Sequence, residues 1–142
     1  MIARWITKSG TGEGHIDMRL FDGTGKPIGG TPILISDKTG ANFQFVDSFG
    51  SAFDADGNIL VVWHGCDADG DGNACGVKGR FVSGTGPVGD ELVIPTTLTG
   101  DQKAPSAVAL GHGAFAVAWN DFSAQQPDVS GAAVRARIIY AN

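Results

Sequence analysis

Apolar residues along the chain occur in short runs that alternate with polar segments rich in glycine. Asp56-Gly57 and Gly111-His112-Gly113 each separate two such runs, and these residue types favour the positive φ angles of tight hairpin turns. No segment places apolar residues at helical spacing between capping residues. No apolar run is long enough to cross a membrane. The pattern therefore predicts an all-β protein built from short strands.

Three tryptophans mark a repeat in this pattern. Trp63 and Trp119 lie 56 residues apart and each ends an apolar run, and Trp5 lies 58 residues before Trp63. A second motif follows each tryptophan, at 16–20, 77–81 and 134–138: a branched apolar residue, two variable residues, an arginine and a large apolar residue. Self-similarity at this period is typical of stacked or radial arrays. We expect about two and a half repeats in a single domain, at roughly 1–50, 51–106 and 107–142.

The complete repeat resolves into four expected strands, at Ser51–Ala55, Asn58–Trp63, Gly76–Val82 and Glu91–Pro95. Three further strands are expected on each side of it. Four-stranded repeats of this length predict the blades of a β-propeller, in which neighbouring blades bury each other's faces. So few blades cannot close a ring, and an open array leaves apolar faces and strand edges exposed. We therefore expect a second copy of the chain to complete the ring, as a homodimer or a higher homo-oligomer.

The charge distribution limits the classes of molecule that the chain is expected to bind. A net charge of −5 disfavours nucleic acid, which needs a basic face. The N-terminus has no basic region followed by a long apolar segment, so we expect no signal peptide in this chain. Between Thr39 and Val77 there is no lysine or arginine, but there are six aspartates: Asp47, Asp54, Asp56, Asp67, Asp69 and Asp71. These carboxylates repel one another unless solvent or a cation intervenes.

Part of this acidic stretch has the spacing of a metal-binding loop. Asp67, Asp69, Asp71 and Asn73 match the opening of a D-x-D-x-D-G calcium loop, in which alternate oxygen ligands converge on one hard cation. The closing positions differ, because Lys78 stands where an EF-hand has its glutamate and Cys75 where integrin-like propeller loops have an aspartate. The alternative is an acidic, solvated hairpin loop without metal. We expect at most one Ca²⁺ site per chain.

Two cysteines flank the same loop. Cys66 and Cys75 each stand next to an expected strand end, so a hairpin would place them within the distance that a disulfide needs. We expect a disulfide here, which favours an exported protein. The alternative is a pair of reduced thiols in a cytoplasmic protein.

The recurring large side chains allow two interpretations each. Trp5, Trp63 and Trp119 either pack between blades or reach the rim and stack on sugar rings, which makes them the candidate ligand-binding residues. Arg19, Arg80 and Arg137 either bind loop carbonyls or carboxylates or line a polar surface. The three histidines share no spacing and have no serine or cysteine partner in a recognisable motif, so no catalytic triad is expected.

These motifs in order resemble a known repeat. The chain reads W…DGDGN…GVKGRF…GTGPVGDELVI…TTLTGDQKAPSAVAL, closely over 61–110 and loosely elsewhere. It resembles the repeat found in tandem in large bacterial surface and secreted proteins, often beside calcium-binding modules. The resemblance implies propeller-like architecture and a secreted or cell-surface location. It implies no established enzymatic activity.

The sequence as a whole predicts a non-enzymatic repeat module for binding or assembly. Glycans or a surface partner are the candidate ligands, and calcium would stiffen one loop. The alternative is a hydrolase or lyase that acts on polysaccharide at a cleft between blades, with paired carboxylates as acid and base.

Native mass spectrometry with and without Ca²⁺ tests the metal, the disulfide and the self-association together. We expect Ca²⁺ to add the mass of one ion per chain, because a single loop has the aspartate spacing. The mass of the chain should also be lower by the two hydrogens that a disulfide removes. An unchanged mass in Ca²⁺ would leave the acidic loop as a solvated hairpin turn.

Overall fold

The computed structural model describes residues 2–8, 14–36, 43–44, 48–67, 75–125 and 129–141. The regular secondary structure in these ranges consists of β-strands alone. Each strand is antiparallel to the strands that it pairs with. The predicted all-β class is confirmed. The described chain contains no helix of the length and apolar character that a membrane span requires.

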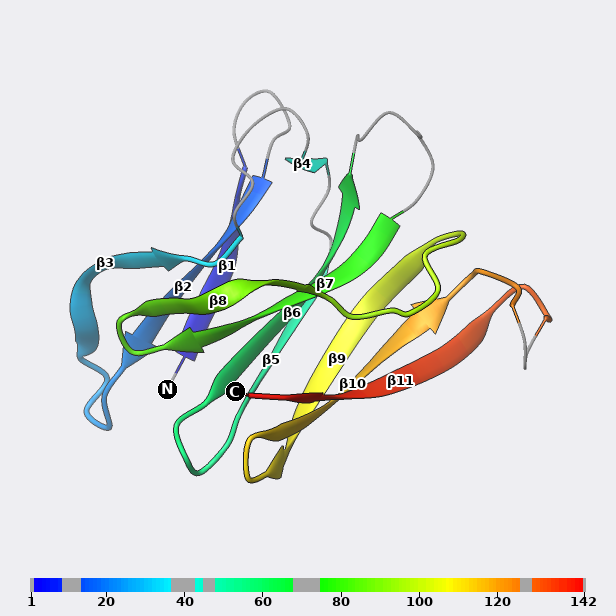
Figure 1. Cartoon of the computed structure of the whole chain (residues 1–142). Helices are drawn as coiled ribbons and strands as arrows, with labels where there is room; N and C mark the ends of the chain where they lie inside the picture. The colour runs from blue at the N-terminus through cyan, green and yellow to red at the C-terminus, as the bar shows by residue number, and fades with distance from the viewer. Residues whose placement is uncertain are drawn as a thin grey trace.

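The strands form three open sheets (Figure 1). The first sheet has the order β1 (Ile2–Lys8), β2 (Gly14–Phe21), β3 (Pro27–Leu34). In the middle sheet, β6 (Ile59–Asp67) pairs on one side with β4 (Phe43–Gln44) and β5 (Phe49–Phe53), and on the other with β7 (Cys75–Ser83), which pairs with β8 (Gly86–Val93). The third sheet has the order β9 (Gln102–Gly111), β10 (Ala114–Asp121), β11 (Ala133–Tyr140).

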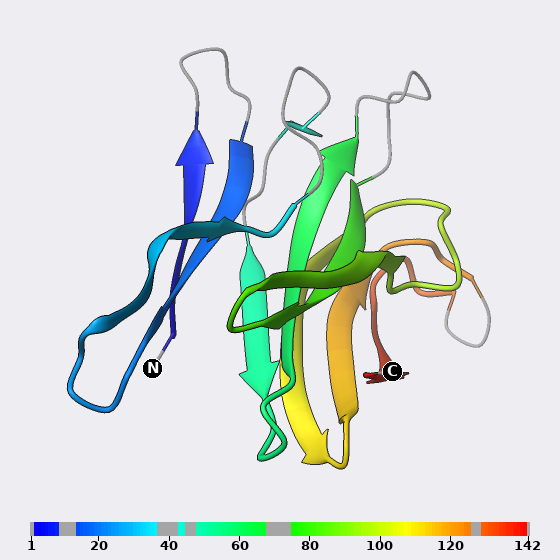
Figure 2. The ribbon, with the colours of Figure 1, turned by 60° about the vertical axis from the view of Figure 1, so that its left-hand side comes forward.

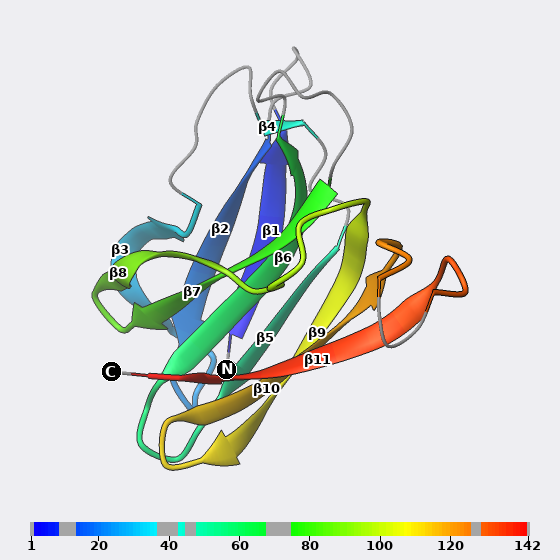
Figure 3. The same cartoon turned by 45° about the vertical axis from the view of Figure 1, so that its right-hand side comes forward.

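The sheets lie side by side as layers. Figures 1 and 2 show the first sheet on one side, the middle sheet next to it and the third sheet on the other side. Figure 3, turned to bring the third sheet forward, shows β9, β10 and β11 together at one side of the molecule. The middle sheet is therefore the only one of the three that is covered by another described sheet on both faces.

Strand pairing has the same register in all three sheets. Trp5 pairs with Asp17, Trp63 with Lys78 and Trp119 with Arg135, and in each case the recurring arginine stands two residues after the partner. The ladder to the next strand is irregular at the same point in the first two sheets, around Arg19 and around Arg80. The spacing that marks the repeat in the sequence is thus the spacing of equivalent strand pairs.

Alternation along β6 sends apolar side chains into two separate cores. Ile59, Val61 and Trp63 enter the core against the first sheet, and Leu60 and Val62 enter the core against the third. The first core consists of Ile16, Met18, Ile35, Ile59, Val61, Trp63 and Val82. The second consists of Ala52, Leu60, Val62, Val77, Ile94, Phe115, Val117 and Trp119. A strand buried on both faces reads as a continuous apolar run, which is why Ile59–Trp63 shows little alternation of apolar and polar residues.

The last strand of the complete repeat was predicted at the wrong place. The structure has β8 from Gly86, paired directly with Ser83, rather than from Glu91. Pro87 and the glycines around it disfavour a strand in sequence terms. An edge strand tolerates proline, because the side that lacks an N–H need not face a partner. The described residues also give eleven strands in place of ten, since two short strands share one edge of β6.

One carboxylate links the middle and third sheets. Oδ1 of Asp54 accepts hydrogen bonds from the backbone N–H groups of Asp56 (3.0 Å) and Asn58 (2.9 Å), which fixes the turn between β5 and β6. Its Oδ2 accepts from the Asn58 side chain (2.9 Å) and from the backbone N–H of Gly113 (3.1 Å), in the turn between β9 and β10. The bonds from Asn58, Gly113 and Asp56 hold the pKa of Asp54 below its ordinary 3.8, although burial opposes them.

The stability of the chain should therefore depend on the ionisation of Asp54. Its pKa is lower in the folded chain than in the unfolded chain, so its contribution is present above the unfolded pKa and is lost as pH falls through the folded pKa. We expect Asp54→Asn to be less stable than wild type at neutral pH and to lose less stability on acidification below about pH 4. Urea unfolding across pH measures both effects.

Asp56→Asn is the matched control, because it removes the same charge from the same turn at an exposed side chain. Equal pH dependence of the two variants would contradict the role of Asp54.

Candidate functional site

Two of the three recurring tryptophans lie in the seams, the interfaces between adjacent sheets. Trp63 has 0% of its surface exposed and packs in the core against the first sheet. Trp119 is 4% exposed and packs in the core against the middle sheet. The side chain of Trp5 lies outside the described residues. The burial of Trp63 and Trp119 favours packing between sheets over stacking on sugars, and a ligand-binding role for the three stays a prediction.

The recurring arginines join adjacent sheets. Nη1 of Arg80 donates to the carbonyl of Ile35, which follows the outer strand of the first sheet (3.0 Å). Nη1 of Arg137 donates to the carbonyl of Ile94, at the equivalent place after the middle sheet (3.0 Å). Arg80 also donates through Nε and Nη2 to the carbonyl of Gly89 in its own sheet (3.0 and 2.9 Å). The interpretation of these arginines as partners of loop carbonyls is confirmed for Arg80 and Arg137.

A recess of about 320 Å³ opens at the seam between the middle and third sheets. It is lined by Thr96, Trp119, Arg135, Ala136 and Arg137. The buried carboxylate of Asp121 contacts two of the lining residues: it pairs with Nε of Arg135 (3.3 Å) and accepts a hydrogen bond from the Trp119 indole. It also accepts a hydrogen bond from the Ser123 hydroxyl. Burial raises the pKa of Asp121, but the bonds from Ser123 and Trp119 and the Arg135 charge outweigh it and leave the pKa lowered.

The sequence interpretation missed this cluster. The signal was present, since Asp121 stands two residues after Trp119 and Arg135 stands two residues before the recurring Arg137. Its recognition required the strand register, which places Arg135 directly opposite Trp119.

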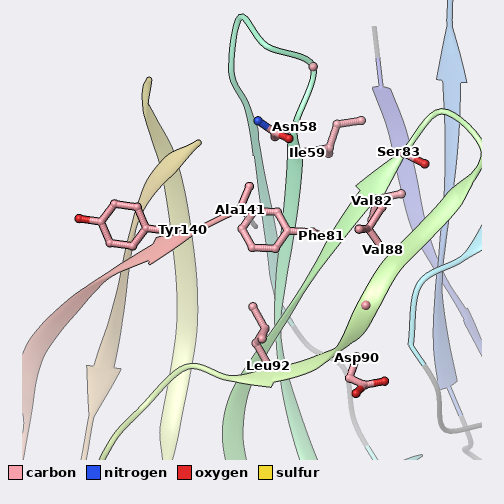
Figure 4. A pocket seen from close by; sticks show the side chains of 12 residues that line it. Asn58, Ile59, Phe81, Val82, Ser83, Val88, Asp90, Leu92, Tyr140 and Ala141 are labelled. Carbon is pink, nitrogen blue, oxygen red and sulfur yellow. The ribbon is translucent and has the colours of Figure 1, made fainter. Parts of the chain in front are cut away.

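Two apolar cavities lie at the same end of the two seams. Figure 4 shows the one of about 250 Å³ beside Phe81, with the Tyr140 ring pointing away from Phe81. The other, of about 190 Å³, lies between the first and middle sheets. Equivalent positions line both, with Leu20, Phe21 and Ile28 in one where the other has Phe81, Val82 and Val88. A cavity that recurs with the repeat is better explained by sheet packing than by one specific ligand.

The predicted calcium ligands lie outside the described side chains. Strand β6 ends at Asp67 and β7 begins at Cys75, so Asp69, Asp71 and Asn73 belong to the segment between them. Within the described ranges, no group of three or more histidine, cysteine, aspartate or glutamate side chains could hold a metal ion. Calcium binding by the acidic loop stays a prediction.

Cys66 and Cys75 form the last pair of the ladder between β6 and β7. Directly opposed residues of an antiparallel pair are close enough for a disulfide. No described cysteine is a free thiol. The side chain of Cys66 is not among those described, so the Cys66–Cys75 disulfide stays a prediction.

Several carboxylates are held ionised by structural contacts. Asp101 accepts from Nζ of Lys103 (2.6 Å) and from the backbone N–H of Cys75 (3.1 Å), and these bonds lower its pKa. Asp22 has a lowered pKa because it accepts from the Thr24 hydroxyl and the backbone of its own turn. A general acid needs a raised pKa. The carboxylates with shifted pKa values are thus suited to fixing turns and sheet contacts rather than to donating a proton.

No family model, curated protein or solved structure matches the chain. The resemblance to the tandem repeats of bacterial surface proteins therefore stays a prediction from the motifs.

Arg80→Lys should weaken the contact between the first and middle sheets. Three guanidinium nitrogens of Arg80 donate to Gly89 and Ile35, and the single ammonium nitrogen of lysine cannot reproduce all of these bonds. We expect a loss of about 1–2 kcal/mol in the free energy of unfolding, measured by urea denaturation in dilute solution.

Arg19→Lys provides the comparison within the repeat. The side chain of Arg19 makes one longer hydrogen bond, to the Gly30 carbonyl of its own sheet (3.3 Å), so its replacement should cost less. Equal losses in the two variants would contradict a specific role of Arg80 between sheets.

Proposed function

We propose that the chain is a non-enzymatic repeat module for assembly, in which propeller-like blades stack face to face. The carrying observation is that both seams are built in the same way. At each seam the tryptophan of one sheet packs toward the sheet before it, and the arginine of the same sheet binds a backbone carbonyl of that earlier sheet. Contacts that recur with the sequence repeat are typical of repeat proteins, in which each unit stacks on its neighbours and the array can be extended by further units.

The order of strands supports the propeller-like part of the proposal. A propeller blade is a four-stranded antiparallel sheet that packs against a blade on each side. The middle sheet runs from β5 through β6 and β7 to β8, with consecutive strands paired, and it is covered on both faces. The first and third sheets repeat parts of this order.

The described carboxylates and indoles support assembly over the other candidates. The shifted carboxylates Asp54, Asp101 and Asp121 have lowered pKa values and engage turns and neighbouring strands, so none of these three is poised as the acid of a glycosidase pair. The buried indoles of Trp63 and Trp119 leave no flat face for a sugar. In this proposal the acidic loop from Asp67 to Asn73 is an accessory element that calcium would stiffen.

Sedimentation velocity over a wide range of concentrations tests the proposed function. We expect species heavier than the 14.6 kDa chain, with a proportion that rises with concentration. Assembly through apolar sheet faces should persist at high salt, because it does not depend on exposed charges. A monomer at every concentration would remove the basis of an assembly module.

A further inference from the structure

The third sheet carries apolar side chains on the face that points away from the middle sheet. Along β10, the residues between Phe115, Val117 and Trp119 point to this outer face, and β9 and β11 extend it on either side. We name it the open face, and its exposed large apolar residues are Val108, Leu110, Val134, Ile138 and Tyr140. Figure 3 shows the three strands that form it at the side of the molecule. Large apolar side chains that gather on one face of a sheet make that face a candidate interaction surface.

The equivalent surface of the middle sheet is buried. Counted from the recurring arginine, Val134 corresponds to Val77, and their exposed fractions are 76% and 0%. The cross-strand row Val108–Ala116–Ile138 corresponds to Ala52–Leu60–Phe81, which packs in the core against the third sheet. The open face thus repeats the surface of the middle sheet that the third sheet covers.

At both seams, the same side of the later sheet packs on the earlier sheet. It is the side of a sheet that carries the recurring tryptophan and arginine, here Trp63 with Arg80 and Trp119 with Arg137. The first sheet has this side as well. Trp5 stands at the equivalent register position, and Ile16 and Met18, which alternate with Asp17 and Arg19, pack on the middle sheet.

Within the described chain, Arg19 lacks the bond to an earlier sheet that its two counterparts make, and its one hydrogen bond goes to Gly30 of its own sheet. Its Nε is buried and has no hydrogen-bond partner. Its counterparts Arg80 and Arg137 each donate through Nη1 to a backbone carbonyl of the sheet before them, whereas Nε of Arg80 donates to Gly89 of its own sheet. A sheet docked on this side would offer the guanidinium of Arg19 the backbone carbonyl that Nη1 of its counterparts binds.

We propose that the open face of one copy docks on the outer side of the first sheet of a second copy, in a head-to-tail contact that continues the stacking of the two seams. This inference rests on the proposed function and specifies the surfaces that carry it. The contact is heterologous, because the two surfaces differ, so its repetition generates a ring when the rotation closes. The hydrophobic effect at the open face provides the driving force.

A charge on the open face tests the first surface. Val134→Asp places a carboxylate in the apolar contact and should weaken self-association by at least about tenfold, measured by sedimentation. Val129→Asp is the matched control, because it changes another exposed valine (61%) that lies outside the three sheets. We expect the control to associate as wild type does, and circular dichroism establishes that each variant is folded.

Mixing two variants tests the head-to-tail geometry. Arg19→Glu should also weaken self-association, because it reverses a charge on the other surface, and Arg19→Gln is the milder substitute if it fails to fold. The Val134→Asp chain keeps its first sheet intact and the Arg19→Glu chain keeps its open face intact. A mixture should therefore form a heterodimer with one productive contact, which native mass spectrometry resolves by mass.

Three results would overturn the inference. Self-association of wild type that Val134→Asp leaves unchanged would place the contact elsewhere, while the proposed assembly function would stand. Wild-type-like homodimers of Arg19→Glu would indicate that the open face pairs with itself. A wild-type chain that stays monomeric would mean that something other than a second copy covers the open face, and the assembly function would fall with it.

Discussion

The two-sided burial of β6 is the constraint on which the structure depends. A single antiparallel sheet of this size cannot bury its own apolar residues, since each face needs a partner layer. Side chains that alternate along Ile59–Trp63 enter two different cores, so one strand holds the first and third sheets in place. The loss of either neighbour would expose half of the strand to water, and each sheet therefore stabilises the next.

Polar contacts determine how adjacent sheets are aligned, which apolar packing alone does not. The hydrophobic effect is non-directional, so two flat apolar faces can slide with little cost. Hydrogen bonds from Arg80 to Ile35 and from Arg137 to Ile94 fix one position along each seam. The bond from Gly113 to Asp54 fixes another, near the turns of the second seam. Directional bonds at separated points thus define how the layers sit on each other.

The sequence predicted the features that repeat and missed those that depend on register. The all-β class, the equivalence of the tryptophan strands and the binding of carbonyls by Arg80 and Arg137 followed from spacing, because equivalent residues meet equivalent surroundings. The start of β8 was predicted wrongly, because glycine and Pro87 have low strand propensity although an edge strand tolerates them. The recess beside Trp119 and the link from Asp54 to Gly113 join residues that no local pattern connects.

The ladder between β6 and β7 continues without a shift from Ile59 and Val82 to Cys66 and Cys75. Trp63 and Lys78 lie inside this ladder, so the pairing of the two strands sets their alignment. Changes in residues 68–74 that leave the pairing of Cys66 with Cys75 intact would therefore leave the alignment of the two seams intact.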